Sequence, residues 1–290
     1  MSSATVEVGG RQLTLTNLDK VLYPDGFTKG QVIDYYVRIA PVMLPYLRGR
    51  ACTMVRWPDG VESGKHFYNK HLPSHTPDWV ERFTQGGVTY GVVNDVATLV
   101  WMANLAALEL HVPMHRAADD TMIPDRMVFD LDPGPGTGVQ ECCRIALAIR
   151  ALLEPLGFAM VAKTSGSKGV QLYARPPEAL PYGGDGGITA LAKRVAEGME
   201  HSDADHVVSR QTKDLRHGKV LIDWSQNVPA KTTVAVYSLR AKSTPTVSTP
   251  LTWDEMAAGA EGQPLSFTAP LLLERVDTLG DLFGLPGDPP

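Results

Sequence analysis

The segment MVFDLDPG, residues 127–134, restricts the possible folds of this chain more than any other. Apolar residues lead into two aspartates separated by one residue, and Pro-Gly ends the run. Residues i and i+2 of a β-strand point to the same face, so we expect Asp130 and Asp132 to project together from the end of a buried strand. Two such carboxylates repel each other unless a cation lies between them, and a divalent metal ion suits that position. The pair alone also fits an exposed strand end with two solvated acids.

The composition indicates an ordinary globular protein without a membrane segment. The 290 residues are 43% hydrophobic and 20% charged, and they suffice for one large domain or two small ones. The first ten residues lack the pattern of a signal peptide, and no apolar run reaches membrane-spanning length. Cys142 and Cys143 are adjacent and Cys52 is remote, which suggests neither a disulfide framework nor a zinc site. We therefore expect a protein of the reducing cytoplasm with no membrane partner.

The net charge of −5 is unevenly distributed along the chain. Residues 251–290 hold seven acidic residues and one basic residue, so the first 250 residues are nearly neutral. A near-neutral body permits local basic patches, and the overall charge argues only mildly against a nucleic-acid partner.

The hydrophobic pattern predicts helices and strands in mixed order. The predicted helices cover residues 28–47, 96–110, 140–156 and 188–199. The predicted strands cover 51–56, 88–93, 127–132, 159–163, 170–174, 220–224 and 232–237. Without a strict βαβ rhythm, an α+β class is as compatible as a mixed α/β class. We expect residues 175–187 to form a surface loop and those after Ser243 to wrap the surface.

A second candidate site is KTSGSKGVQLY, residues 163–173, which predicts a strand, a turn of small residues and another strand. Glycines in the turn can adopt positive φ and bring backbone N–H groups close to an anion, while serine hydroxyls and a lysine add donors. This is what a triphosphate requires, although the spacing is not that of a Walker A loop and a plain hairpin turn has similar composition. The candidate nucleotide ligands in the turn are Ser165, Gly166, Ser167, Lys168 and Gly169.

A third carboxylate, Asp223, ends the apolar run in KVLIDWSQN at residues 219–227, and Gln226 follows it. An aspartate at a strand end is common turn chemistry when it stands alone. Together with Asp130, Asp132 and the turn of small residues, it completes a minimal set for two-metal nucleotidyl transfer.

Basic and aromatic residues elsewhere suggest a nucleic-acid partner. Basic side chains stand beside Phe67 and Tyr68 in the segment KHFYNKH, residues 65–71, and Arg56 precedes it. This arrangement suits stacking on exposed nucleobases, but it also suits a hydrophobic loop anchor. Positive charge surrounds the Asp223 segment and would suit a metal–triphosphate complex or DNA. The residues that contribute it are Arg210, Lys213, Arg216, Lys219, Lys231 and Arg240.

With its motifs in this order along the sequence, the chain resembles the primase-polymerase domain of bacterial DNA ligase D, a member of the archaeo-eukaryotic primase superfamily. The resemblance covers nearly the whole chain and is carried by TNLDKVLYP, APVMLPYLRGR, RWPDGVE, ALELHVP, VFDLDPG, TSGSKG, KVLIDWSQN and KTT-VAVYSLR. It implies a catalytic core of two apposed β-sheets with flanking helices. It also implies one domain over residues 1–290, with a DNA-binding part (about 1–120), a catalytic core (about 121–243), an acidic wrap (244–290) and no ligase or nuclease module.

The resemblance also implies roles for individual residues. Asp130, Asp132 and Asp223 match catalytic metal ligands for two Mn²⁺ or Mg²⁺ ions. Positions around the incoming NTP or dNTP are matched by His111, Ser165, Lys168, Gln226 and Arg240, with the rest of the turn and Gln171 beside them. Asn17, Lys20 and Lys29 match a pocket for the DNA 5′-phosphate, and Arg56, Phe67, Tyr68 and Arg216 match contacts to DNA or its template strand.

The implied activity is that of a DNA-directed nucleotidyltransferase that fills short gaps or ends in DNA repair, favours manganese and prefers ribonucleotides. The chain departs from the family pattern at Gln171, which replaces the usual histidine, and at Val55, which interrupts the basic pair usually found before Trp-Pro. It resembles stand-alone relatives such as the mycobacterial Prim-PolC type, and the resemblance implies a nucleoid-associated protein in the cytoplasm. The implied partners are gapped or broken DNA and a DNA ligase of the C type in excision repair, or a ligase of the D type and Ku in end joining.

Two other classes of protein share part of this pattern. Phosphatases of the haloacid dehalogenase type also have D-x-D at a strand end, but Thr or Val normally stands where this chain has Gly134, and their motif lies near the start of the chain. A non-catalytic DNA-end-binding module would not need all three carboxylates.

Overall fold

A computed structural model describes residues 3–117, 122–285 and 288 of the chain. The main helices are α1 (Lys29–Leu47), α2 (Val96–Asn104), α3 (Val139–Leu153), α4 (Ile188–Ser202), α5 (Trp253–Ala260) and α6 (Ala269–Leu279). The strands are β1 (Ser3–Val8), β2 (Arg11–Thr16), β3 (Ala51–Arg56), β4 (Phe67–Asn69), β5 (Arg82–Gln85), β6 (Val88–Val92), β7 (Ala107–Val112), β8 (Met127–Pro133), β9 (Ala159–Thr164), β10 (Val170–Arg175), β11 (Val207–Val208), β12 (Val220–Asp223), β13 (Thr233–Val234) and β14 (Pro250–Leu251).

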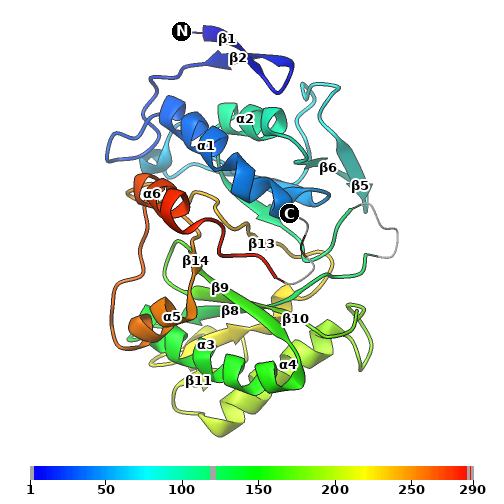
Figure 1. The fold of residues 1–290 in the computed structure, drawn as a ribbon, viewed down its shortest axis with the longest axis vertical. Coiled ribbons are helices and arrows are strands. Elements are labelled where there is room, and N and C mark those ends of the chain that lie inside the picture. The colour runs from blue at the N-terminus through cyan, green and yellow to red at the C-terminus, as the bar shows by residue number, and fades with distance from the viewer. Residues whose placement is uncertain (1–2, 118–121, 286–287, 289–290) are drawn as a thin grey trace.

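These elements form two lobes, each built around its own larger sheet (Figure 1). The upper lobe contains α1, α2, α6 and the sheet β13-β7-β3-β6-β5, with β4 beside β3 and the β1-β2 hairpin at its far end. The lower lobe contains α3, α4, α5 and the sheet β11-β12-β8-β10-β9-β14. A single cluster of buried apolar side chains runs through both lobes. The mixed α and β class with two sheets and flanking helices agrees with the prediction.

Antiparallel pairing organises most of the lower sheet around β8. β10 and β12 flank β8, and β9 continues the sheet beyond β10. Met127, Val128 and Phe129 are fully buried, because α3 and α4 pack against this sheet. The sheet therefore holds the end of β8, with its two aspartates, in a fixed frame.

The predicted starts of α1 and α2 are confirmed to within one residue, and a side-chain cap stands at each of them. The Thr28 side chain accepts a hydrogen bond from the Gln31 N–H, and the Asp95 side chain accepts one from the Thr98 N–H. α4 begins at the predicted residue and extends three residues further. α3 ends at Leu153, and a 3₁₀ turn follows it up to Gly157, whose φ of 86° is left-handed.

The helix predicted over 96–110 is wrong in its second half. α2 ends at Asn104, Ala106 adopts a left-handed φ of 57°, and β7 follows. Glu109 and His111 therefore lie on a strand that pairs with β3, not on a helix. A continuous apolar run fits a buried strand as well as a buried helix, which is why periodicity did not distinguish them. The strand predicted over 232–237 is likewise reduced to Thr233–Val234.

The segment after Ser243 does more than wrap the surface, contrary to the prediction. Residues 247–251 are buried, and Pro250–Leu251 forms the edge strand β14 beside β9. α5 packs on α3 in the lower lobe, and α6 packs beside α1 in the upper lobe (Figure 1). The segment therefore connects the two lobes. The loop predicted over 175–187 is confirmed between β10 and α4, with Tyr182 buried in it.

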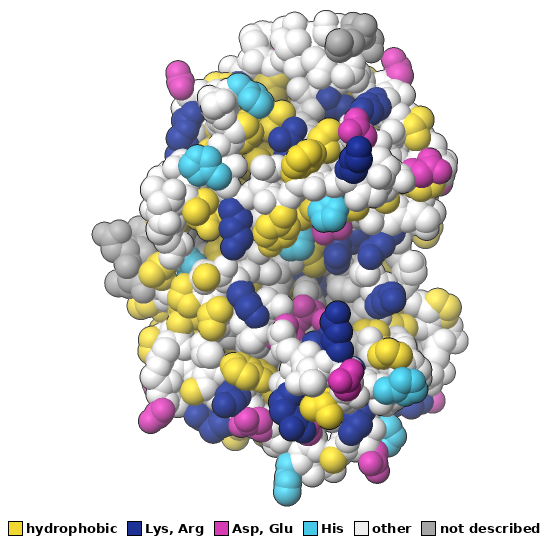
Figure 2. Space-filling model, turned by 180° about the vertical axis from the view of Figure 1, so that it is seen from behind, with side chains coloured by type: hydrophobic (Ala, Val, Ile, Leu, Met, Phe, Trp, Pro, Cys, Tyr) yellow, Lys and Arg dark blue, Asp and Glu magenta, His cyan; other side chains and the backbone are white. Residues whose placement is uncertain are grey.

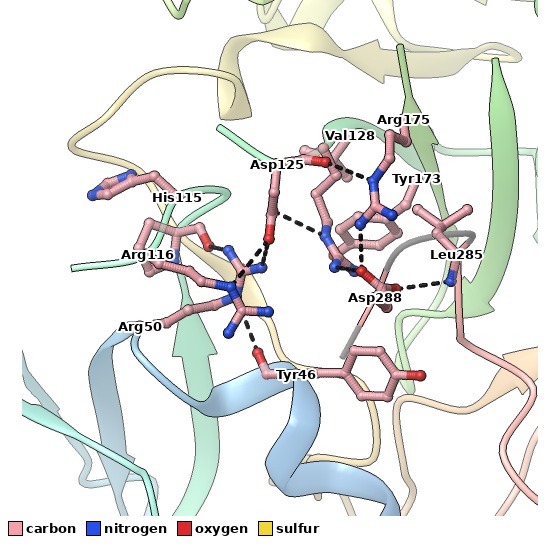
Figure 3. A network of polar contacts seen from close by, with 12 residues as sticks. Tyr46, Arg50, His115, Arg116, Asp125, Val128, Tyr173, Arg175, Leu285 and Asp288 are labelled. Atoms are coloured by element: carbon pink, nitrogen blue, oxygen red, sulfur yellow. Dashed lines mark hydrogen bonds and ion pairs between the residues drawn. The ribbon is translucent and has the colours of Figure 1, made fainter. Parts of the chain in front are cut away.

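A network of charged side chains also joins the lobes (Figure 3). Arg50, just after α1, donates hydrogen bonds to Asp125, to the Pro113 carbonyl (3.1 Å) and to the Tyr46 carbonyl (3.1 Å). Asp125 also pairs with Arg116 (3.6 Å) and Arg126 (3.2 Å). Arg50 and Arg116 contact one oxygen of this carboxylate and Arg126 contacts the other, so the arginines hold the entry of β8 against the upper lobe.

The three cysteines are buried and free, as predicted. Within residues 3–117, 122–285 and 288, none of the helices combines the length and apolarity needed to cross a bilayer.

Candidate active site

Strand register brings the three predicted carboxylates to one face of the lower sheet. β12 runs antiparallel to β8, and Asp223 lies directly opposite Asp130. Residues opposite each other on neighbouring strands share a face, and Asp132 shares that face with Asp130 because it is two residues further along the strand. Three acids from two strands therefore lie side by side. For Asp130 and Asp132, the sequence predicted this shared face.

The cations near these acids compensate their charge only in part. Burial, followed by the charge of Asp132, raises the pKa of Asp130 to about 7. Burial and the charge of Asp223 also raise the pKa of Asp132. Among the described residues neither side chain forms an ion pair within 4.0 Å, although Arg216 and Arg240 lie near enough to oppose the rise at Asp132. Such a site favours binding of a proton or a cation.

The oxygen donors match divalent cations such as Mg²⁺ and Mn²⁺, but they do not all converge. In the described part of the chain, no group of three or more His, Cys, Asp or Glu side chains is arranged to hold a metal ion. One oxygen of Asp223 accepts hydrogen bonds from the Ser225 N–H (3.0 Å) and hydroxyl (2.6 Å), and the other accepts one from the Gln226 amide (2.9 Å). Asp130 and Asp132 therefore offer carboxylate oxygens to a cation, and the second oxygen of Asp223, which accepts a single hydrogen bond from Gln226, keeps a lone pair for one.

The predicted turn of small residues joins β9 to β10. Gly166 has a φ of 67°, and a Cβ there would lie 2.7 Å from the Cγ of Arg240. Gly169 does not have positive φ, contrary to expectation; a Cβ there would lie 2.0 Å from the Leu131 carbonyl oxygen, so glycine is required by close packing against β8. The N–H groups of Ser167 and Gly169 are both 3.2 Å from the Ser165 hydroxyl, which therefore organises the turn.

The acids and the turn face one cavity of about 460 Å³. On the side shown in Figure 2, acidic side chains lie recessed in a hollow near the middle of the molecule, with Lys and Arg around them. Asp223 does not line this cavity, and Gly166 and Gly169 line another cavity, of about 720 Å³, behind the turn. The predicted site residues that do line the 460 Å³ cavity are Tyr68, His111, Asp130, Asp132, Ser165, Ser167, Lys168, Gln171, Arg216, Gln226 and Arg240.

Glu109, which sequence reasoning missed, connects two of these residues. One Glu109 oxygen lies 3.0 Å from the Nε2 of His111, and the other lies 3.2 Å from the Nε of Arg240 and accepts a hydrogen bond from the Ala241 N–H (3.0 Å). Burial alone would raise the pKa of Glu109, but His111 and Arg240 outweigh it and hold this pKa at about 2. Arg240 in turn donates to the Ser165 carbonyl. Glu109 thus links β7 of the upper sheet to the turn of the lower sheet.

Lys163, also missed, lies fully buried beneath the acids. Its ammonium donates to the Gln171 side-chain oxygen (2.5 Å), the Ser248 hydroxyl (2.6 Å) and the Val234 carbonyl (3.0 Å). The Gln171 amide then donates to Asp130 (3.0 Å). Gln171 therefore passes an orienting hydrogen bond from a buried cation to the first aspartate. A lysine among apolar strand residues in AMVAKT was the signal that the sequence offered.

The three residues predicted to bind a 5′-phosphate come together in the upper lobe. The Lys20 N–H donates to the Asn17 carbonyl (3.0 Å), and the Lys29 N–H donates to the Lys20 carbonyl (2.8 Å). The Lys29 ammonium contacts the Thr16 carbonyl and hydroxyl. Burial, followed by the charges of Lys20 and Arg56, lowers the pKa of Lys29 to about 8. Lys20, Lys29 and Arg56 carry like charges and form, with the neutral Asn17, a basic cluster that suits an anion; Lys20 also pairs with Asp59 (3.2 Å).

The two predicted aromatic contacts are separated by the alternation of β4. Tyr68 and His111 meet edge to face with ring centroids 6.0 Å apart, and the Tyr68 hydroxyl lies 3.1 Å from that of Thr232. Phe67 is 55% exposed and lies opposite Arg56 in the β3-β4 register. Arg56 itself donates to the Leu105 carbonyl (2.9 Å). Tyr68 thus belongs to the cavity with the acids, whereas Phe67 lies at the surface next to Arg56.

Comparison with known proteins identifies relatives over nearly the whole chain. The model of the LigD primase-polymerase domain family matches residues 28–283. The multifunctional non-homologous end joining protein LigD of Mycolicibacterium smegmatis is 46% identical over 277 residues, which cover 93% of this chain and 35% of that protein. The bifunctional LigD of Bacillus subtilis is 32% identical over 285 residues, covering 96% of this chain and 45% of that protein. This chain thus spans between about a third and a half of these relatives.

A solved structure agrees with the fold. The polymerase domain from Mycobacterium tuberculosis ligase D in complex with DNA is 41% identical and superimposes with a TM-score of 0.86, covering 93% of this chain and 96% of that one. The archaeo-eukaryotic primase-type fold predicted from the sequence is therefore confirmed. The chain belongs to the family of LigD primase-polymerase domains, which are DNA-directed nucleotidyltransferases.

Proposed function

We propose that this protein extends a DNA 3′ end across a short gap by DNA-templated nucleotidyl transfer, with a preference for ribonucleotides. The observation that carries the proposal is the 460 Å³ cavity, in which Asp130 and Asp132 face the turn of small residues that contains Lys168. Acids on one wall and cationic donors on the other match the opposite needs of a metal-bound nucleophile and a triphosphate.

Asp130 and Asp132 would hold one divalent cation, and Asp223 would complete a two-cation site through the lone pair that Gln226 leaves free on its second oxygen. Bound there, Mn²⁺ or Mg²⁺ would favour ionisation of the attacking 3′-hydroxyl and neutralise the leaving pyrophosphate. The chain's own contribution is position. Gln171 holds Asp130 from below through the hydrogen bond that Lys163 supports, so the carboxylate is oriented before substrate arrives.

Three cationic side chains are placed to hold the triphosphate. Lys168 and Arg240 lie at the turn, and Arg216 lines the same cavity. The buried Nε of Arg216 has no hydrogen-bond partner among the described residues, which is costly unless a ligand supplies an acceptor. A phosphate oxygen would supply one.

The basic cluster and Phe67 would hold the DNA. A 5′-phosphate at the far side of a gap would satisfy Lys20, Lys29 and Asn17, and the exposed ring of Phe67 would stack on an unpaired template base. We propose that the DNA-binding part (about 1–120) and the catalytic core (about 121–243) act as one catalytic domain, since one hydrophobic cluster runs through both.

Two repair settings would use this activity. The relatives are named as non-homologous end joining proteins, which favours broken ends as substrates. For that setting we propose Ku and a ligase D-type enzyme as partners in the cytoplasm. Gap filling with a ligase C-type enzyme in excision repair is the second setting, favoured by the basic cluster that suits a 5′-phosphate across a gap.

The test is primer extension on gapped DNA, with and without the 5′-phosphate, in Mn²⁺ or Mg²⁺ and with ribo- or deoxynucleotides. We expect extension that is faster with the 5′-phosphate, with Mn²⁺ and with ribonucleotides. Failure to extend under every combination would refute the proposal. Equal rates with and without the phosphate would remove only the role of the basic cluster.

A further inference from the structure

Glu109 determines how His111 presents itself to the cavity. His111 lies on the wall of the 460 Å³ cavity, and its Nε2 is 3.0 Å from a Glu109 oxygen. An ionised carboxylate can only accept hydrogen bonds, so Nε2 must carry the proton of this contact. Both Glu109 oxygens are occupied by donors, since Ala241 and Arg240 face the second oxygen. The carboxylate is thus locked and cannot turn away from His111.

This environment favours the neutral form of the ring at neutral pH. Burial lowers the pKa of His111, and the charges of Arg240 and Lys163 lower it further, against the opposing effect of Glu109. The neighbours that face the ring are therefore Glu109 on its own strand, Arg240, Lys163 on β9 and the edge of Tyr68 on β4. A neutral ring with its proton on Nε2 has a lone pair on Nδ1.

We propose that Glu109 is a positioning residue that fixes His111 as a hydrogen-bond acceptor for a hydroxyl group of the nucleotide sugar. This inference rests on the proposed function, because it concerns the nucleotide that the cavity would hold. A lone pair on Nδ1 repels phosphate oxygens, which are acceptors themselves, and attracts a hydroxyl, which can donate. His111 would therefore select for the sugar, while Lys168, Arg216 and Arg240 bind the phosphates.

The variant Glu109→Gln tests this mechanism because it exchanges one oxygen for an NH₂ group. Facing Ala241 N–H and Arg240, the amide must keep its oxygen on that side, which directs the NH₂ toward His111. Nε2 must then accept, and the proton moves to Nδ1. The ring becomes a donor toward the cavity, with little change in shape.

The readout is KM for nucleotides that carry a hydroxyl, a fluorine or a hydrogen at the 2′ position, and separately at the 3′ position, in single-nucleotide incorporation. Fluorine replaces the hydroxyl but cannot donate. In the native protein we expect KM to rise about tenfold for both the fluoro and the deoxy nucleotide in one of the two series. In Glu109→Gln the difference between hydroxyl and fluorine should fall below about threefold, while kcat changes less than KM.

Three controls separate positioning from general damage. Glu255→Gln makes the same change in a carboxylate that pairs with Arg275 away from the cavity and should leave every ratio unchanged. Glu109→Asp retains the charge and should retain the preference for hydroxyl over fluorine. In His111→Ala, the added change Glu109→Gln should have no further effect on the ratio, because Glu109 acts through His111.

An unchanged ratio of hydroxyl to fluoro nucleotide in folded Glu109→Gln, or no preference in the native protein, would overturn this inference. Either result would leave the proposed function intact as long as the native protein extends DNA. If Glu109→Gln does not fold, the inference is still overturned when folded Glu109→Asp loses the preference for hydroxyl over fluorine, or when the native protein lacks it. Absence of any extension by the native protein would instead refute the proposed function.

Discussion

Two aspartates near β8 show how differently this molecule treats charge. Asp125, at the entry of the strand, is enclosed by Arg50, Arg116 and Arg126, and these arginines overcome its burial to hold its pKa at about 2. Asp130, at the exit, lies beside other carboxylates and accepts a hydrogen bond from the Gln171 amide, and its pKa is raised to about 7 although the charge of Lys163 opposes the rise. Among the described residues, ion pairs neutralise the charge of Asp125, whereas no ion pair within 4.0 Å neutralises that of Asp130. A carboxylate kept in this state is typical of a ligand site, because the fold gains nothing from it.

The strongest test of this contrast removes the uncompensated charge. Asp130→Asn keeps the shape and the contact with Gln171, but it should lower primer extension by at least about a thousandfold, since a cation ligand is lost. The same change should not destabilise the metal-free protein at pH 8 and should raise its free energy of unfolding by about 1 kcal/mol, since carboxylate repulsion is relieved. Extension assays and urea unfolding measure the two effects.

Metal binding provides the matched readout. Mn²⁺ should raise the melting temperature of the native protein and of the surface variant Asp277→Asn, but much less that of Asp130→Asn. If Asp130→Asn extends primers at a rate near that of the native protein, Asp130 is not a metal ligand. If it unfolds more easily, the carboxylate is structural and the contrast with Asp125 disappears.

The second test removes one of the cations that neutralise Asp125. Arg50→Met leaves the Tyr46 and Pro113 carbonyls without their donor and removes one of the three cations around Asp125. We expect a loss of about 3–5 kcal/mol in the free energy of unfolding at pH 7, measured by urea denaturation. Because the folded pKa of Asp125 lies below its unfolded value, its stabilising effect is present above about pH 4 and disappears as the pH falls through about 2. The penalty should therefore shrink toward pH 2.

The control for this variant is Arg38→Met, which removes an exposed ion pair of 4.0 Å with Asp34 and should cost less than about 0.5 kcal/mol. Folded Arg50→Met should extend primers at saturating nucleotide within about twofold of the native rate. A large fall in kcat without a loss of stability would mean that the compensated network serves catalysis, contrary to the comparison.

Structural features that depend on residues close together in the sequence could be predicted from it. Thr28 and Asp95 are of residue types that cap helix N-termini, and the i, i+2 rule places Asp130 and Asp132 on one face. The hairpin around the turn of small residues also follows from its glycines and serines. Strand order could not be predicted in the same way, because Asp223 meets Asp130 only through the pairing of β12 with β8. Asp223 follows Asp130 by 93 residues, and neither a repeat nor a spacing rule in the sequence indicates that pairing.

The missed residues share one property: their roles depend on contacts between lobes. Glu109 was assigned to a helix because the apolar run before it continues through Leu110, and only the left-handed Ala106 separates α2 from β7. Lys163 gains its role from Gln171, Val234 and Ser248, which come from three other segments. Ser248 lies in the segment predicted to wrap the surface. Pattern rules treat each segment separately, so contacts of this kind escape them.

The prediction with the smallest expected effect concerns Lys29, a basic residue among like charges. Lys29 lies among Lys20 and Arg56 as Asp130 lies among acids, and its pKa is lowered to about 8. Lys29→Ala should reduce the advantage of a 5′-phosphate in gap extension by about tenfold, because one charge-assisted hydrogen bond is lost. Lys193→Ala, on α4 and paired with Glu197, is the matched control and should leave that advantage unchanged.

The pH dependence of this advantage distinguishes a desolvated lysine from an ordinary surface lysine. A lysine whose pKa lies near 8 is protonated at pH 7 and loses its charge as the pH rises toward 9.5, whereas the DNA phosphate stays doubly charged throughout. The 5′-phosphate advantage should therefore fall severalfold between pH 7 and 9.5, less steeply at saturating DNA because the bound phosphate favours the protonated lysine. Lys29→Arg, which stays charged, should keep a constant advantage over this range. A constant advantage in the native protein would mean that Lys29 is not desolvated beside other cations, and the parallel with Asp130 would fail at the basic cluster.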